Sequence, residues 1–189
     1  MDIPKRRPRK KNKLNKKQFM IAGCVIGAVA LIVAACFLFS DKSEQNDGAV
    51  VYDPNRGPLK ELTVGELTRQ GEITVGKTSY LEFEYPYAFS DLIGVTAIND
   101  DHQTALAFYA KLDGLDRPLY TIWFNGSKGQ NVGAFDLQDG EKPVLVTVVF
   151  HKPAEELNQD WRTTFYATQE TVNDVLVSIQ KDPHFVNIE

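Results

Sequence analysis

The sequence predicts an α+β protein in which a single N-terminal transmembrane helix precedes an antiparallel β-sheet covered by a long C-terminal amphipathic helix. Three observations predict this class. Residues 19–39 form an uncharged apolar run. Short β-like segments between residues 59 and 151 are separated by turn dipeptides such as Asp113-Gly114 and Asp139-Gly140. After Pro153 the apolar residues recur at helical spacing instead of strand spacing.

The apolar run is long enough to cross a lipid bilayer. A helix of this length reaches about 31 Å, which matches the hydrocarbon core of a membrane. Residues 1–18 before it form a basic arm with nine Lys/Arg and one acid. Because such arms stay in the cytoplasm, we expect a single-pass protein of the cell membrane, with its N-terminus cytoplasmic and its C-terminal domain extracellular.

Two other interpretations of the run remain open. A cleavable signal has a shorter apolar region and a small-residue cleavage site, whereas this run ends in bulky residues. Val33-Ala34-Ala35-Cys36 is similar to a bacterial lipobox, in which Cys36 would carry lipid after cleavage. The apolar residues after Cys36 favour a retained signal-anchor helix over both alternatives.

The charge of the chain is divided sharply between its two ends. The whole chain has 21 Lys/Arg and 25 Asp/Glu, so removing the arm leaves 12 Lys/Arg against 24 Asp/Glu, a net charge of −12. Such an acidic domain repels nucleic acid, and none is expected as a partner. Both cysteines, Cys24 and Cys36, fall in the apolar run, so the outer part cannot form an internal disulfide, which suits a bacterial cell surface.

The outer part is predicted to comprise a flexible tether at residues 40–58 and one extracytoplasmic α+β domain at residues 59–189. Gly48, Pro54, Gly57 and Pro58 favour the tether. In the domain, apolar and polar residues alternate as in half-buried strands. The predicted strands are Leu59–Thr68, Glu72–Val75, Tyr80–Tyr85, Ile93–Ile98, Thr104–Leu112, Leu119–Phe124, Val132–Leu137 and Val144–His151.

A long amphipathic helix is predicted from Pro153 to Asp182. Its apolar positions are Leu157, Trp161, Phe165, Val172, Leu176 and Ile179. We expect Trp161, Phe165 and Leu176 to anchor it on the sheet, and we expect Trp123 to lie in the core as well.

The order of these elements resembles a known family. An opening strand that runs into Phe83-Glu84-Tyr85-Pro86-Tyr87, a curled antiparallel sheet and a closing helix are similar to PsbP-like α+β domains. They are also similar to uncharacterised single-pass outer domains of Clostridia-type bacteria. The resemblance covers roughly residues 80–186, implies a fold and an accessory or binding role, and carries no catalytic residues.

Two groups of residues form the predicted partner surface. Tyr85, Tyr87 and Phe89 could line a groove for a glycan or peptide, although such clusters more often pack in a core. The glycine-rich segment after Asn125-Gly126 is typical of a mobile hairpin loop. Its candidate contact residues are Ser127, Lys128, Gln130 and Asn131.

We therefore expect a non-enzymatic binding or accessory module of the cell envelope, whose partner is an envelope protein or a wall component. No catalytic residue, metal ligand set or cofactor is predicted. One alternative is an extracytoplasmic hydrolase that uses carboxylates or a metal near His102, since Asp100, Asp101 and His102 form a local cluster. Another is a single-pass sensor or regulator, since small residues in the span suit helix packing.

Overall fold

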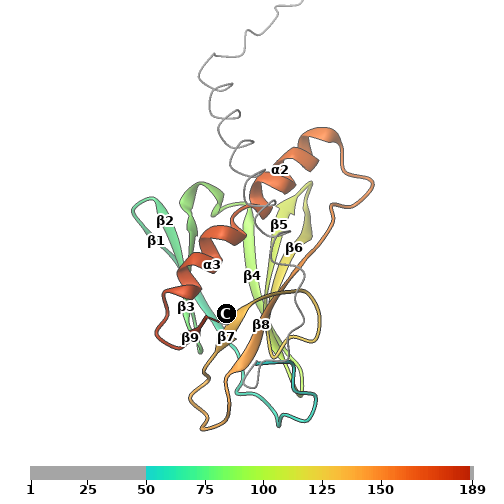
Figure 1. Cartoon of the computed structure of the whole chain (residues 1–189). Coiled ribbons are helices and arrows are strands. Elements are labelled where there is room, and N and C mark those ends of the chain that lie inside the picture. Colours follow the sequence, from blue (N-terminus) through green and yellow to red (C-terminus); the bar gives the residue numbers. More distant parts are fainter. Residues whose placement is uncertain (1–49, 188–189) are drawn as a thin grey trace, which may run out of the picture. The chain divides into compact units, whose positions relative to one another are not determined.

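The structure is a computed structural model, described here for residues 50–187. The described residues belong to the second of the two units into which the chain divides, residues 48–189. The basic arm (1–18), the predicted transmembrane helix (19–39) and residues 40–49 of the predicted tether lie outside the described residues. The described part of the second unit is coloured in Figure 1.

The first three strands form a separate antiparallel sheet. Strands β1 (Val64–Gln70), β2 (Ile73–Thr78) and β3 (Glu82–Pro86) lie side by side in that order. A tight turn at Gly71 joins β1 to β2 with a φ of 64°, a conformation that favours glycine. In β3, Phe83 and Tyr85 are buried while Glu82 is exposed, as the alternating sequence predicts. A single 3-10 turn, η1 (Tyr87–Phe89), follows this strand.

The remaining strands form a six-stranded antiparallel sheet. They are β4 (Ile93–Asn99), β5 (Thr104–Leu112), β6 (Leu115–Phe124), β7 (Gln130–Phe135), β8 (Val144–Phe150) and β9 (Phe185–Val186). Their order is β4-β5-β6-β8-β7-β9. At the β5–β6 hairpin, Asp113 and Gly114 both have positive φ, as a type I′ turn requires. The turn chemistry in the sequence therefore located this hairpin correctly.

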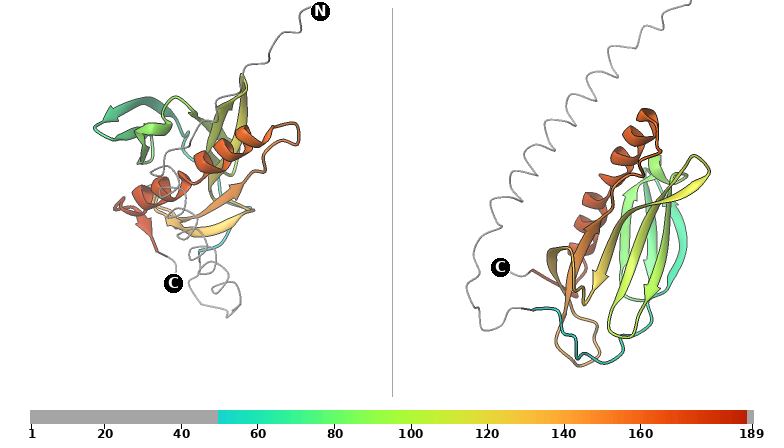
Figure 2. Two further views of the ribbon diagram at one scale, coloured as in Figure 1. Left: turned by 90° about the horizontal axis from the view of Figure 1, so that it is seen from above. Right: turned by 90° about the vertical axis from the view of Figure 1, so that its right-hand side faces the viewer.

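Two helices follow β8 and cross the same side of the strands (Figure 2). Helix α2 (Gln159–Gln169) begins after Asn158, whose side chain accepts a hydrogen bond from the Trp161 N–H. Helix α3 (Val172–Gln180) begins after a break at residues 170–171. The hydroxyl of Thr171 donates to the Thr168 carbonyl at 2.7 Å, which is the local side-chain bonding by which threonine competes with the helix ladder.

The core lies between the two sheets and the helices. Phe108 is at its centre, because its ring lies 5.2 Å from Phe83 of the small sheet and 4.6 Å from Tyr120 on the neighbouring strand. Phe165 of α2 and Ile179 of α3 are completely buried in the same cluster. Aromatic rings at these separations stabilise each other beyond the burial of their area.

Helix α3 also covers the free edge of the small sheet. It packs along β3 and touches β9 at the end of the large sheet. The Ser178 hydroxyl accepts a hydrogen bond from the Glu84 N–H at 2.9 Å, so a helix side chain replaces the missing neighbouring strand. In this way α3 closes the space between the edges of the two sheets.

The predicted fold class is wrong. The described residues are mainly β and form two antiparallel sheets, not one sheet, and the single long helix is two shorter ones. The sequence pattern locates strands but does not say which strands pair. Where α2 ends, the Thr171 hydroxyl bonds back to the Thr168 carbonyl. No helix within residues 50–187 is both long and apolar enough to span a membrane.

Candidate functional site

The side of the six-stranded sheet opposite the core is the main candidate surface. Cross-strand pairing aligns two rows of residues on it, and together they are called the outer face here. The first row is Ile98, Ala105, Trp123, Thr147 and Asn131, and the second is Thr96, Ala107, Thr121 and Val149. The alternate residues on the same strands, such as Leu106, Phe108 and Ile122, belong to the core.

Tyr109 extends the outer face beyond the second row. It pairs with Gly94 on β4, and its ring lies directly over that glycine. A Cβ atom at Gly94 would lie 2.1 Å from the ring carbon Cζ, so the absence of a side chain is what allows the ring to lie there. One ring face is therefore fixed against the sheet, and Tyr109 stays half-buried.

The outer face carries no charge within the described residues, although the domain is acidic. Every member of both rows is aliphatic, aromatic, hydroxyl-bearing or an amide. Lys111 and Asp116 are cross-strand neighbours near the β5–β6 hairpin, beyond Tyr109. Ala105, Thr121 and Thr147 are buried, so this side presents to solvent the neutral remainder of the two rows together with two half-buried aromatic rings.

The predicted contact loop lies at one margin of the outer face. The Thr147 hydroxyl donates to the Lys128 carbonyl at 2.7 Å, which holds the loop over β8. Ser127, Lys128, Gln130 and Asn131 are all exposed, and Asn131 is itself part of the first row. The structure thus brings these four predicted residues to one place.

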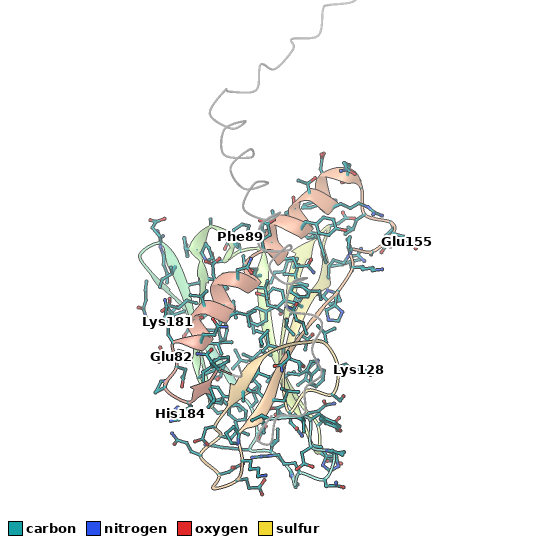
Figure 3. All side chains as sticks on the ribbon, viewed as in Figure 1. Glu82, Phe89, Lys128, Glu155, Lys181 and His184 are labelled. Atoms are coloured by element: carbon teal, nitrogen blue, oxygen red, sulfur yellow. The ribbon has the colours of Figure 1, made fainter. Side chains whose placement is uncertain are left out.

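The predicted aromatic residues are not brought to that place. Tyr85 is 1% exposed and lies in the core, where burial raises its pKa to about 12. Tyr87 is half-buried, with the Arg69 guanidinium 3.8 Å above its ring. Phe89 packs against the core on a different part of the molecule from Lys128 (Figure 3). These three residues therefore do not form one groove.

The three histidines have separate partners. His102 Nδ1 lies 2.9 Å from the Arg56 carbonyl, and His151 Nε2 lies 3.0 Å from the Thr121 hydroxyl. His184 Nδ1 lies 3.0 Å from the Asp182 carboxylate. In the described part of the chain, no three His, Cys, Asp or Glu residues are grouped so that they could hold a metal ion.

Asp100 and Asp101, the neighbours of His102, form a local turn. The Asp100 carboxylate accepts the backbone N–H of Asp101 at 2.8 Å. Asp100 and His102 of the predicted cluster are therefore already engaged in hydrogen bonds, with Asp101 and with Arg56.

Asn125 joins the segment before β1 to the domain. Its side-chain oxygen accepts the Asp53 N–H at 3.0 Å, and its amide nitrogen donates to the carbonyls of Asp53 and His102. Asn125 is 1% exposed and has a φ of 58°. Three segments that are distant in sequence therefore meet at one amide, and residues 53–56 are fixed to the domain.

Arg56 makes a second connection beside it. Its guanidinium donates to the Asp139 carboxylate at 2.6 Å and to the Lys142 carbonyl at 2.5 Å, and Nε lies 3.5 Å from Glu141. A cavity of about 540 Å³ adjoins this point, between residues 50–53 and 142–144. Arg56, the buried cation beside this cavity, is already paired with Asp139 and Glu141. These contacts therefore hold residues 53–56 against the domain.

Sequence reasoning missed the two aromatic residues of the outer side, Tyr109 and Trp123. Trp123 was expected in the core, but it belongs to the first row and lies outside the core cluster. Thr121 and Asn125, two positions before and after Trp123, are polar. Because alternate residues of a strand share one side, this pattern indicated that Trp123 lies on the side of β6 away from the core. Gly94 is the signal for Tyr109, because a strand glycine often accommodates a ring from the next strand.

No family model, curated protein or solved structure matches this chain, and the resemblance to PsbP-like domains therefore stays a prediction.

Asn125→Asp is expected to destabilise the domain by about 2 kcal/mol at pH 7. The ionised carboxylate can still accept the Asp53 N–H, but it places a second oxygen against the carbonyls of Asp53 and His102. Denaturant unfolding of both proteins from pH 7 to pH 4 measures the difference. It should shrink as the new carboxyl is protonated and can donate again, whereas a difference independent of pH would contradict the account.

Arg56→Met removes the hydrogen bonds to Asp139 and to the Lys142 carbonyl and is expected to lower the free energy of unfolding at pH 7 by about 1–2 kcal/mol. The loss is modest because solvent reaches both partner carboxylates. Burial alone would raise the pKa of Asp139, but hydrogen bonds from the Glu141 N–H and Arg56 outweigh it and hold the pKa below its usual value. Since the folded-state pKa is depressed, this stability is present above the unfolded pKa and is lost below about pH 4.

The measurement is denaturant unfolding of both proteins at several pH values. The two free energies should converge as the pH falls through the titration of Asp139. Lys77→Met is the matched control, since Lys77 pairs with Glu82 at an exposed site and its loss should change little. Equal losses in the two variants would show that the Arg56 pair contributes no more than an exposed ion pair, and a loss that does not change with pH would show that Arg56 does not act through Asp139.

Proposed function

We propose that the protein is a membrane-anchored, extracytoplasmic binding module of the cell envelope, and that its outer face binds a neutral envelope component. One observation carries the proposal: an acidic domain keeps two rows of residues, one across five strands and one across four, free of Lys, Arg, Asp and Glu. Uncharged surfaces with half-buried aromatic rings are typical of recognition sites. The exposed loop that contains Lys128 supplies polar groups at the margin.

Membrane attachment is the part of this proposal that rests on sequence. Residues 19–39 are long and apolar enough to cross a bilayer, and the basic arm before them favours a cytoplasmic N-terminus. Ten residues, 40–49, separate the run from the first described residue, and they reach at most about 35 Å when extended. A domain on so short a connection works close to the membrane that holds it.

Binding through a surface also fits the chemistry of the polar side chains. The histidines have separate hydrogen-bond partners, and Tyr85 is in the core. The residues that converge instead are small, hydroxyl-bearing and aromatic. Such groups recognise a partner by contact and hydrogen bonding.

The topology is tested by cysteine labelling in intact cells. Ser127 is exposed, so Ser127→Cys should react with a membrane-impermeant maleimide without permeabilisation. Asn12→Cys, in the basic arm, should react only after permeabilisation. A variant with Cys24 and Cys36 replaced by serine serves as the background, and the opposite labelling pattern would refute the proposed orientation.

The outer face is tested by adding charge without removing packing. Thr96→Glu places a carboxylate among neutral residues and should weaken binding to isolated envelopes of the producing cells by about tenfold or more. The measurement is cosedimentation of the full chain, reconstituted in nanodiscs of neutral lipid. Thr163→Glu is the matched control, since Thr163 is also an exposed threonine but lies on α2.

The control should bind as the unmodified protein does. If both variants bind normally, the outer face is not the binding surface. Thermal unfolding of each variant shows whether a loss of binding is a loss of folding.

A further inference from the structure

We infer that the component bound by the outer face is a neutral, hydroxyl-rich glycan chain, an inference that rests on the proposed function. The other candidates on the molecule carry less. The cavity beside Arg56 is bordered by a cation that is already paired, and the buried hydroxyls of Tyr120 and Thr171 bond to each other. The outer face is the place where aromatic, hydroxyl and amide groups meet on one surface.

Tyr109 provides a stacking platform. Its ring is fixed over Gly94, so one face lies against the sheet and the other is directed away from it. The face of an aromatic ring carries negative charge density, which attracts the weakly positive C–H groups of a pyranose ring. A tyrosine held flat in this way loses little conformational freedom when a sugar stacks on it.

Trp123 provides a second aromatic group on the next strand. It pairs with Ala105 and Thr147, and the second row between it and Tyr109 holds Ala107 and Thr121. Ala107 is small, and Thr121, which is 6% exposed, bonds through its hydroxyl to the imidazole of His151, so this ring lies over that part of the sheet. A polymer that contacts both aromatic residues crosses the strands beside this imidazole.

Polar groups lie along this path. Thr96 and Asn131 are exposed at opposite ends of the two rows, on β4 and β7. Ser127 and Lys128 are exposed on the loop that bends over β8. Hydroxyl and amide groups can donate hydrogen bonds to sugar hydroxyls and accept them, and the ammonium group can donate them. The outer face therefore combines apolar and hydrogen-bonding groups, as a sugar ring does.

Charge selects among the glycans. The part of the chain outside residues 1–18 has a net charge of −12, which disfavours a phosphate-bearing or carboxylate-bearing polymer. A neutral chain pays no such penalty, and the uncharged rows leave none of its hydroxyls against a carboxylate. A neutral glycan therefore fits better than an anionic wall polymer or an anionic lipid surface.

The inference is tested with the full chain in nanodiscs of neutral lipid. The chain has two tryptophans, so Trp161→Phe leaves Trp123 as the sole reporter of indole fluorescence. Titration with chitohexaose, a neutral oligosaccharide, should shift its emission to shorter wavelength. Retention on envelope glycan from which protein and phosphate polymers have been removed is measured in parallel.

Variants identify the platform. Tyr109→Ala should reduce retention on the glycan by about tenfold or more, and Tyr109→Phe should keep it within about threefold, since the ring face remains. Tyr166→Ala is the control, because Tyr166 is 52% exposed but lies on α2. Equal retention of all three variants would overturn the inference, and thermal unfolding excludes a loss of folding as the cause.

The outcomes separate the inference from the proposed function. If untreated envelopes are bound and the stripped glycan is not, the glycan inference fails while the binding module stands. Loss of binding after proteolysis of the envelopes would identify a protein partner and likewise overturn the inference. If neither material is bound, both proposals fail. Retention that salt abolishes on a phosphate-bearing polymer would exclude a neutral ligand.

Discussion

The alternation of side chains along β5, β6 and β8 is the constraint on which the rest of the structure depends. Because successive residues of a strand point to opposite sides, the positions that place Phe108 and Ile122 in the core also place Tyr109 and Trp123 on the other side. The core and the outer face are therefore two results of one pattern. A register shift of one residue would exchange them and would destroy both.

That constraint explains how much the sequence could predict. The hairpin at Asp113-Gly114 and the strands that flank it follow from local rules of turn chemistry and alternation. The division into two sheets does not, because the pairing of β3 with β2 alone depends on α3 occupying its other edge through Ser178. The break between α2 and α3 depends on Thr171, whose hydroxyl also meets Tyr120 across the core.

The candidate surface was predictable only in part, and for a related reason. The loop with Ser127 and Lys128 is exposed because it consists of glycine and polar residues, which contribute little to a hydrophobic core. Its exposure could therefore be predicted from its composition. Tyr85 and Trp123 are both large aromatic residues on strands, and the side on which each lies is set by its partner strands. Periodicity assigns residues to alternate sides of a strand, but the location of the core requires the third dimension.

The geometry of Asn125 also affects how the protein ages. Asparagine followed by glycine is the pair most prone to spontaneous deamidation, in which the next backbone nitrogen attacks the side-chain amide. Here the Gly126 N–H is bonded to the Leu145 carbonyl, and the amide of Asn125 is held by Asp53 and His102. Both reacting groups are engaged, so the hydrogen bonds that attach residues 53–56 to the domain also slow the deamidation of Asn125.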